Sequence, residues 1–177
     1  LLFVGVFAAN NVSIQMGGQV TFTATDVYGD VTITYSGAAN NPARLYADFD
    51  ASTPDGTVTW DEGNPSEQNL VFNQGDPIRV TIAIHNEADD RAMWVLFENL
   101  PSITSAEFSS ILSVSTPHYG VNGTENTLSA NTLFSIPANT TYQVKFDLQL
   151  SSYNQTISGE DATWTCNFAL SNSQPSA

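Results

Sequence analysis

Positively charged residues are scarce in this chain. It contains four Lys and Arg residues against 18 Asp and Glu, so its formal net charge is −14 at pH 7. Proteins bind nucleic-acid backbones and anionic membrane surfaces through clustered cations, so both classes of partner are excluded. Charged residues make up 12% of the chain, against roughly 25% in an average soluble domain. Its polarity therefore comes mostly from Ser, Thr, Asn and Gln.

Cysteine is almost absent, and long apolar runs are missing. The single Cys166 excludes an internal disulfide framework and a zinc site built from cysteines. No stretch reaches the roughly 20 apolar residues that a membrane span requires. The chain begins with Leu1 rather than Met, which indicates a processed product whose targeting segment has been removed. These features predict a secreted protein of the cell surface or the extracellular matrix, with no membrane span.

Groups suited to catalysis are few. His85 and His118 are the only histidines, and neither lies in a His-Glu-x-x-His metalloprotease motif. A Gly-x-Ser-x-Gly elbow and a phosphate-binding glycine loop are also missing from the sequence. Acidic neighbours such as Asp89 and Asp90 are adjacent in the chain, where they do not readily face each other as acid and base. The sequence predicts a protein that is not an enzyme and that requires no cofactor.

Apolar and polar residues alternate over many short runs. Such alternation is typical of half-buried antiparallel strands, and pairs such as Gly17-Gly18, Asp55-Gly56 and Asn122-Gly123 mark turns between them. The pattern predicts an all-β fold, a single antiparallel β-sandwich, with at most one short helix over Ser102–Leu112. The expected strands are Gln19–Thr25, Val31–Tyr35, Ile78–Asn86, Tyr142–Leu150 and Ala162–Leu170.

The N-terminus departs from this alternation. The run Leu1–Ala9 is apolar on both faces, whereas Val12, Ile14 and Met16 alternate with polar residues after Asn10. A strand that is apolar on both faces should be covered on both sides. The run holds six large apolar side chains. At roughly 1.5–3 kcal/mol each, they represent about 9–18 kcal/mol of burial as an upper bound. We therefore expect these side chains to be buried rather than exposed to solvent.

Three interpretations of the run are open: a first strand of its own sandwich, a fragment of a signal peptide or membrane anchor, or a donor strand for the next subunit. Strand addition satisfies the open edge of an acceptor sheet and buries the donor's side chains. Because donor and acceptor sites differ, such a contact is head-to-tail and propagates into a filament. We favour this third interpretation, with a protruding donor segment, residues 1–16, and a sandwich domain, residues 17–177. The expected donor side chains are Leu1, Leu2, Phe3, Val4, Val6, Phe7, Val12 and Ile14.

The segment Asn73–Asn86, followed by Met93–Phe97, resembles the core of the TasA/camelysin family of secreted fibre subunits. The shared features are a Gly-Asp-Pro turn, an alternating strand that ends in Asn, a short polar break and a second alternating strand. The hydrophobic N-terminus and the two late strands continue the resemblance. It implies a jelly-roll-like sandwich that is secreted after signal-peptide removal and assembles with copies of itself into pilus or biofilm-matrix fibres. Archaeal bundling pili share this plan.

The alternative function is a secreted carbohydrate-binding or adhesin module. Trp60, Trp94, Trp164 and six Tyr residues offer aromatic surface on which sugar rings can stack. Trp94 and Trp164 lie in apolar strands and are expected in the core, which leaves Trp60 as the exposed aromatic candidate. A sugar-binding module does not explain the apolar N-terminus, so we rank it below the filament subunit.

Two sets of residues are candidates for modification or ion binding. The Asn-x-Ser/Thr pattern of N-glycosylation sites occurs at four positions, and the acidic stretch around Asp55-Gly56 resembles the end of a calcium-binding loop. The spacing of the first acidic residues does not match such a loop, so a solvated hairpin turn is the favoured interpretation. The glycosylation candidates are Asn11, Asn122, Asn139 and Asn154, and the calcium candidates are Asp48, Asp50, Asp55, Asp61 and Glu62.

Overall fold

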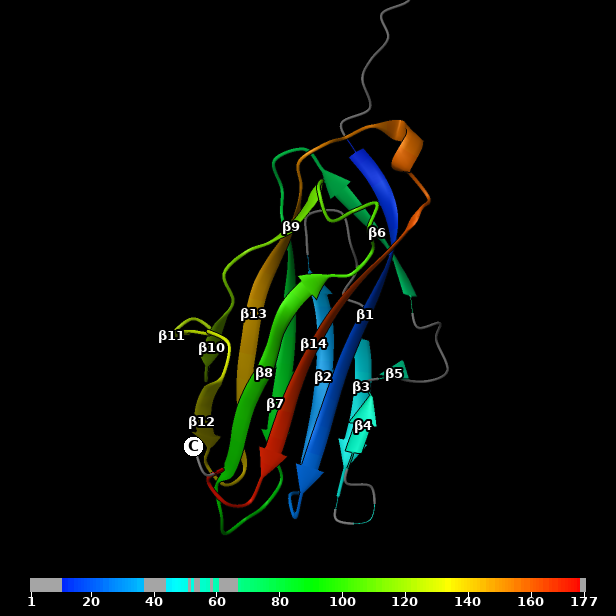
Figure 1. The fold of residues 1–177 in the computed structure, drawn as a ribbon. Helices are drawn as coiled ribbons and strands as arrows, with labels where there is room; N and C mark the ends of the chain where they lie inside the picture. Colours follow the sequence, from blue (N-terminus) through cyan, green and yellow to red (C-terminus); the bar gives the residue numbers. More distant parts are fainter. Residues whose placement is uncertain are drawn as a thin grey trace, which may run out of the picture.

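The alternating runs form strands in the computed structural model, which describes residues 11–36, 44–50, 52, 55–57, 59–60 and 67–175. Figure 1 shows these strands arranged as two sheets that lie one in front of the other. The prediction of an all-β sandwich is therefore confirmed. The five predicted strands fall within β1 (Asn11–Thr25), β2 (Gly29–Ser36), β7 (Ile78–Asn86), β13 (Thr140–Leu150) and β14 (Asp161–Ser171).

The front sheet of Figure 1 has six strands, in the order β12-β8-β14-β1-β4, with β6 also paired to β1. Its remaining strands are β4 (Asp55–Thr57), β6 (Glu67–Asn73), β8 (Met93–Ile103) and β12 (Thr132–Ile136). The rear sheet has eight strands, in the order β11-β10-β13-β7-β2-β3-β5, with β9 also paired to β13. Its remaining strands are β3 (Arg44–Phe49), β5 (Thr59–Trp60), β9 (Leu112–Val114), β10 (His118–Gly120) and β11 (Asn126–Thr127).

One pair of strands departs from the predicted antiparallel arrangement. Strands β1 and β14 run parallel, in register from Gln15↔Asp161 to Thr25↔Ser171, whereas the other described pairs are antiparallel. Parallel neighbours cannot be joined by a tight hairpin and need a long connection, and β1 and β14 are far apart in the chain. Alternation has the same period in both kinds of pair, so the sequence pattern could not distinguish them.

The short helix allowed over Ser102–Leu112 does not form. This stretch ends β8, passes through turns and begins β9. The main-chain N–H groups of Phe108 and Ser109 both donate to the carbonyl of Ser105, at 3.1 Å. The Ser105 hydroxyl accepts the N–H of Thr163 at 2.7 Å. Within the stretch, the Ser109 hydroxyl donates to the carbonyl of Ala106 at 2.9 Å, and serine side chains that bond to the nearby main chain compete with helix formation. The described helical turn of the chain is instead the 3-10 segment η2 (Gln155–Ile157).

Strand β1 crosses the boundary that the sequence predicts between residues 16 and 17. Met16 and Val20, on either side of it, are both 0% exposed and face the same core. Between them Gly18 allows a close approach: a Cβ there would lie 2.7 Å from the Trp164 ring and 2.5 Å from the Tyr35 hydroxyl. The alternation continues through the glycine pair, so residues 11–16 are part of the sandwich.

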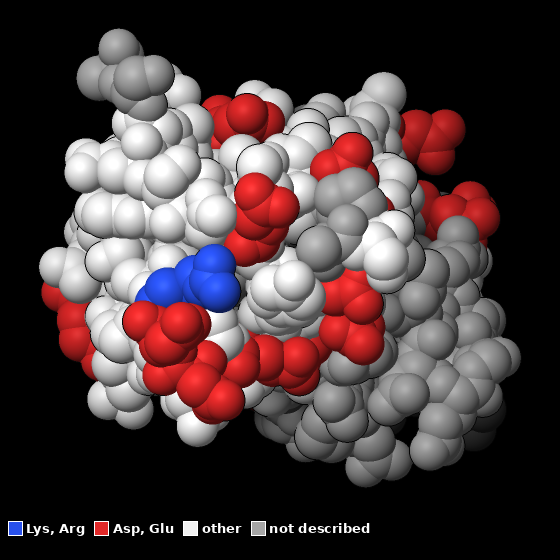
Figure 2. Space-filling view, turned by 90° about the horizontal axis from the view of Figure 1, so that it is seen from below, with Lys and Arg blue, Asp and Glu red and all other residues white. Residues whose placement is uncertain are grey.

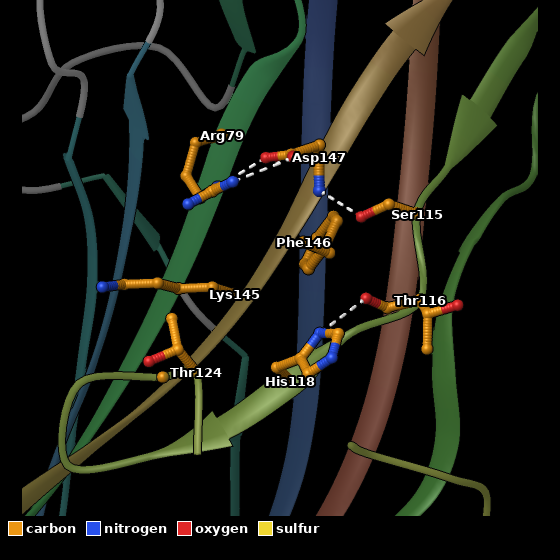
Figure 3. A pocket seen from close by; sticks show the side chains of 9 residues that line it. Arg79, Ser115, Thr116, His118, Thr124, Lys145, Phe146 and Asp147 are labelled. Atoms are coloured by element: carbon orange, nitrogen blue, oxygen red, sulfur yellow. Dashed lines mark hydrogen bonds and ion pairs between the residues drawn. The ribbon is translucent and has the colours of Figure 1, made fainter. Parts of the chain in front are cut away.

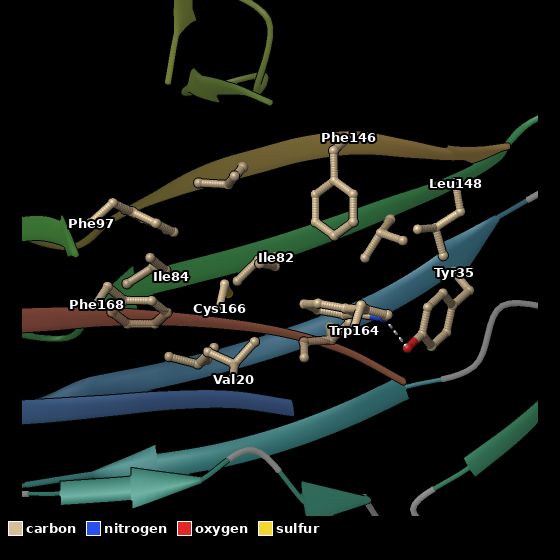
Figure 4. Close-up of a cluster of buried hydrophobic side chains, with 14 of the residues drawn as sticks. Val20, Tyr35, Ile82, Ile84, Phe97, Phe146, Leu148, Trp164, Cys166 and Phe168 are labelled. Carbon is tan, nitrogen blue, oxygen red and sulfur yellow. Dashed lines mark hydrogen bonds between the residues drawn. The ribbon is translucent and has the colours of Figure 1, made fainter. Parts of the chain in front are cut away.

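The largest side chains buried between the sheets are mostly aromatic, and they pack among Val, Ile and Leu side chains (Figure 4). Trp164 and Tyr35 are both 0% exposed, and the indole Nε1–H of Trp164 donates to the Tyr35 hydroxyl at 2.9 Å. This bond satisfies the one polar atom of a buried indole. Burial also raises the pKa of the Tyr35 hydroxyl well above its usual value. Phe146 meets the Trp164 ring edge-on, with ring centres 5.2 Å apart.

Candidate functional site

The predicted donor segment is described from Asn11 onward, where it forms the first half of β1. Val12 and Ile14 are 0% exposed in the core of their own chain, and their backbone pairs antiparallel with Phe72 and Leu70 of β6. The assignment of Val12 and Ile14 to a donated segment does not hold in this structure, because their side chains already fill its core. The other predicted donor residues, Leu1, Leu2, Phe3, Val4, Val6 and Phe7, lie outside the described residues.

The same stretch of β1 is also fixed on its other side. The N–H of Gly159 donates to the carbonyl of Ser13 at 2.7 Å, and the N–H of Gln15 donates to the carbonyl of Glu160 at 3.0 Å. These bonds come from the connection between β13 and β14. The described chain therefore starts in an anchored strand, at the upper end of the sandwich in Figure 1.

All four predicted glycosylation residues are exposed. Asn122 and Asn139 lie in turns, and Asn139 has a positive φ of 48°. The side-chain oxygen of Asn154 accepts the N–H of Thr156 at 3.1 Å, whereas Asn11 begins strand β1. Exposure is necessary for glycosylation, and the modification itself stays a prediction.

The acidic stretch does not assemble a metal site within the described residues. Asp50 uses one carboxylate oxygen to accept the N–H of Ser52 at 2.7 Å and its hydroxyl at 2.6 Å, and Asp55 accepts the N–H of Ala24 at 3.3 Å. The described chain, which includes Asp48, holds no group of three or more His, Cys, Asp or Glu side chains suited to a metal ion. Asp61 and Glu62 lie outside the described residues, so calcium binding stays a prediction. The turn expected at Asp55-Gly56 is wrong, because both residues belong to β4 and pair with β1.

Neither of the Trp side chains that the structure describes is fully exposed. Trp164 is buried, as the sequence predicts, whereas Trp94, also expected in the core, is only half-buried, because Met93 and Val95 on either side of it face the core instead. The side chain of Trp60 is not among those described. Of the two histidines, His85 is half-buried with its Nδ1 2.9 Å from the Thr141 hydroxyl, while His118 lines a cavity. Cys166 is buried, and burial raises the pKa of its thiol.

The cavity that His118 lines has a volume of about 490 Å³ and lies on the outer face of the eight-stranded sheet (Figure 3). It forms where β13 changes partners: β9 pairs with residues 148–150 and β10 with residues 143–145. Between them Ser115 bridges the gap. Its N–H donates to the carbonyl of Asp147 at 2.9 Å, and its hydroxyl accepts the N–H of Asp147 at 2.8 Å.

The turn between β10 and β11 forms a second wall of the cavity. Lys145 Nζ donates to the carbonyl of Asn122 at 2.6 Å, and the two carboxylate oxygens of Glu125 accept the N–H groups of Asn122 and Thr124 at 2.9 and 3.0 Å. The hydrogen bond from Thr124, followed by that from Asn122, lowers the pKa of Glu125. Gly123, with φ of 71°, lies directly against the Lys145 side chain. The side chains of Lys145, from β13, and Glu125, from the turn itself, thus hold the turn over the sheet.

A bidentate ion pair closes the third side. Arg79 Nε and Nη2 donate to the two carboxylate oxygens of Asp147 at 2.5 and 2.9 Å, across the register of β7 and β13. This hydrogen bonding raises the pKa of Arg79. His118 Nδ1 lies 3.1 Å from the carbonyl of Thr116, which can only accept, so this nitrogen carries the proton. Alternation puts Arg79 and Lys145 on outward faces, but the sequence does not reveal that the two strands are neighbours.

One end of the molecule is strongly acidic. The β1–β2 and β7–β8 connections lie side by side there, because Gly29 pairs with Asn86. Figure 2, which views the molecule from the lower end of Figure 1, shows acidic side chains around a small basic area. Asp90 forms an ion pair with Arg91 at 3.2 Å. The exposed acidic residues of these two connections, here called the acidic end, are Asp26, Glu87, Asp89 and Asp90.

Comparisons with known proteins identify no family. No family model and no curated protein matches this chain. Among solved structures, the mu-homology domain of yeast delta-COP-I, complexed with a Dsl1 WxWxV peptide, is 7% identical over 90% of this chain and 97% of that chain, with a TM-score of 0.18. A score this low carries no argument. Within the part of the chain that the structure describes, no helix has the length and apolar character to cross a membrane.

Proposed function

We propose that this protein is the structural subunit of an extracellular filament, in which the apolar run Leu1–Ala9 of each copy is buried by the next copy. The observation that carries the proposal is the contrast between this run and the strand that follows it. The run is apolar on both faces. By contrast, the first six residues of β1 expose or half-expose Asn11, Ser13 and Gln15 on the outer face and bury Val12, Ile14 and Met16 on the inner face.

The anchoring of β1 supports this division. Asn11–Met16 is held by β6 on one side and by the connection before β14 on the other. Because β1 begins at the upper end of the sandwich in Figure 1, the proposal places the contact made by the run at that end rather than at the middle of a face. Contact between the end of one copy and a different surface of the next is head-to-tail, and it produces an open filament. The donated segment of the proposal ends before Asn11.

The sandwich has sheet edges at which a further strand can pair. Neither sheet closes into a barrel, and β12, at one edge of the six-stranded sheet, pairs with β8 as its one partner among the described strands. An edge strand exposes unpaired N–H and C=O groups, and a strand from another chain satisfies them. Secretion and a place in surface or matrix fibres belong to the same proposal. The acidic composition supports secretion, and the resemblance of Asn73–Asn86 and Met93–Phe97 to secreted fibre subunits supports both.

Electron microscopy of matched variants tests the proposal. The full chain is compared with Val4→Asp/Val6→Asp, which puts two charges into the apolar run, and with Ser173→Asp/Gln174→Asp, which puts two charges at exposed positions near the other terminus. Both variants change the formal net charge from −14 to −14 − 2 = −16, so general repulsion affects them equally. We expect filaments from the full chain and the second variant and discrete particles from the first.

Three results would overturn the proposal: no filaments from the full chain, filaments from the Val4→Asp/Val6→Asp variant, or equal loss in both variants. Circular dichroism of each variant checks that the sandwich is intact. A deletion of Leu1–Ala9 provides an independent check, because it should leave a soluble β-rich monomer.

A further inference from the structure

The cavity described above gathers most of the positive charge that the described chain offers. The structure describes the side chains of three of the four cations. Arg91 lies at the acidic end and pairs with Asp90, whereas Arg79 and Lys145 line the cavity together. Among the lining residues, these two cations face one carboxylate, that of Asp147, in a chain whose net charge is −14. Glu125, in the turn that forms one wall, directs both of its carboxylate oxygens at main-chain N–H groups.

These cations keep hydrogen-bond donors available. Lys145 has three N–H donors and directs one of them to the carbonyl of Asn122. Arg79 has five, of which those on Nε and Nη2 bond Asp147. Its Nη1 remains for a further acceptor. In Figure 3 the Lys145 and Thr124 side chains lie on the same side of the cavity.

The rest of the lining is suited to hydroxyl groups. Ser115, Thr116 and Thr124 contribute hydroxyls, each of which can both donate and accept. The Asp147 carboxylate has lone pairs beyond those used by Arg79, because an ionised carboxylate has about four acceptor positions. A ligand with one negative charge and several hydroxyls would satisfy both parts of this lining.

The walls are held in place before any ligand arrives. Glu125 fixes the turn through two main-chain N–H groups, Lys145 fixes it through Asn122, and Ser115 ties the opposite wall to β13. Preorganisation of this kind reduces the entropy lost on binding. A volume of about 490 Å³ also lies within the range of roughly 300–1,000 Å³ found for small-molecule sites.

We propose that this cavity binds an acidic sugar, such as a uronic acid unit of a polysaccharide. The sugar carboxylate accepts hydrogen bonds from Lys145 and from Arg79 Nη1, and the ring hydroxyls bond to Thr124, Thr116 and Asp147. The filament proposal does not enter this inference, which holds for a monomer as well. A second copy's acidic end is a poorer occupant, because its carboxylates bring no ring hydroxyls for Thr124, Thr116 and Asp147 to bond.

The test uses the full chain, a trimer of galacturonic acid and the matched neutral trimer of galactose. Two-dimensional ¹H–¹⁵N NMR follows the titration of each sugar into labelled protein. The acidic trimer should shift the amide signals of residues 115–125 and 145–147 and leave those of the acidic end in place. The neutral trimer should bind at least about tenfold more weakly, because a hydrogen bond between charged groups contributes about 1.5–3 kcal/mol.

Variants separate this site from a general charge effect. Lys145→Gln and Arg91→Gln each make the net charge one unit more negative, but only Lys145 lines the cavity. We expect Lys145→Gln to weaken binding of the acidic trimer about tenfold or more and Arg91→Gln to leave it unchanged. Thr124→Val removes a hydroxyl without removing the main-chain bond that holds the turn, and it should weaken binding about two- to tenfold.

Four outcomes overturn the inference: no binding of the acidic trimer to the full chain, equal binding of the neutral trimer, equal losses in Lys145→Gln and Arg91→Gln, or tighter binding of a synthetic peptide with the sequence of residues 86–91. The last result would assign the cavity to a contact between copies. Each outcome leaves the filament proposal untouched, because none of them depends on the apolar run.

Discussion

Asn86, at the end of β7, offers the sharpest test of how the sandwich is held together. It is 1% exposed. Its Nδ2 donates to the carbonyls of Arg91, Ile136 and Pro137 at 2.9, 3.1 and 3.2 Å, and its Oδ1 accepts the N–H of Ala88 at 3.1 Å. One amide therefore joins the β7–β8 connection of the acidic end to the connection between β12 and β13.

The Asn86→Ala variant loses these bonds and leaves their partners without the amide. A typical hydrogen bond contributes about 0.5–1.5 kcal/mol net, and an unsatisfied buried group costs about 1–3 kcal/mol. Several of the partners are only part-buried and regain some water. We therefore expect a loss of about 2–4 kcal/mol from the free energy of unfolding, out of about 5–15 kcal/mol for a domain. For a chain of this size, that is a fall in Tm of about 4–16 °C.

The Asn86→Asp variant changes the chemistry at nearly constant shape. At neutral pH one carboxylate oxygen takes the place of Nδ2 and faces the carbonyl oxygens that Nδ2 bonds in the full chain. Two acceptors repel each other, so this variant should be less stable than Asn86→Ala. Burial disfavours the charged form and raises the pKa of the introduced acid in the folded state. The folded state then binds more protons than the unfolded state, so the deficit should shrink as the pH falls through that raised pKa.

Urea unfolding of the full chain and of both Asn86 variants between pH 4 and pH 8 measures these differences. Each variant is compared with the full chain at the same pH. An Asn86→Ala variant within about 0.5 kcal/mol of the full chain would refute the account of Asn86 as a structural link, since that is the range of surface substitutions. An Asn86→Asp variant whose deficit does not depend on pH would refute the proposed contacts of its side chain.

Three further predictions concern single positions. Gly18→Ala should lower the free energy of unfolding by about 1–3 kcal/mol, as overpacking does, because its Cβ would lie 2.7 Å from the Trp164 ring; an unchanged urea midpoint would contradict this. NMR titration of the Glu125 carboxyl should give a pKa below that of free Glu, chiefly because the carboxylate accepts the N–H of Thr124. The turn should therefore keep its hydrogen bonds to Glu125 until the pH falls through this lowered pKa. An ordinary pKa would show that Glu125 does not hold the turn. A thiol reagent should modify Cys166, which is buried with a raised thiol pKa, only after the protein unfolds, and rapid labelling of the folded protein would refute its burial.

Alternation was enough to predict the fold class but not the topology. The run from Ile78 to Asn86 reads directly as a strand that is buried on alternate positions, and the structure agrees. Nothing in the same pattern distinguishes the parallel pairing of β1 with β14 from an antiparallel one. The pattern also continues through Gly17 and Gly18, where glycines indicate a turn. Here Gly18 is instead required by the close approach of Trp164 and Tyr35.

The cavity beside Lys145 and Asp147 could not be predicted because it depends on pairing between distant strands. Asp147 and Arg79 are 68 positions apart, and they meet only because β13 lies beside β7 in one particular register. A slip of one residue would turn each side chain to the opposite face. By contrast, Asn86 gave a readable signal: a polar residue that ends an alternating strand at a position expected to face inward.

The central claim is that the apolar run Leu1–Ala9 of one copy is buried by the next. Cryo-electron microscopy of filaments assembled from the full chain tests it most directly, because side-chain density identifies the subunit against which each run lies. The account predicts that the run of one subunit pairs with a sheet edge of its neighbour while β1 stays in its own sandwich from Asn11 onward. A run that lies against its own subunit, with copies joined by other surfaces, would contradict it.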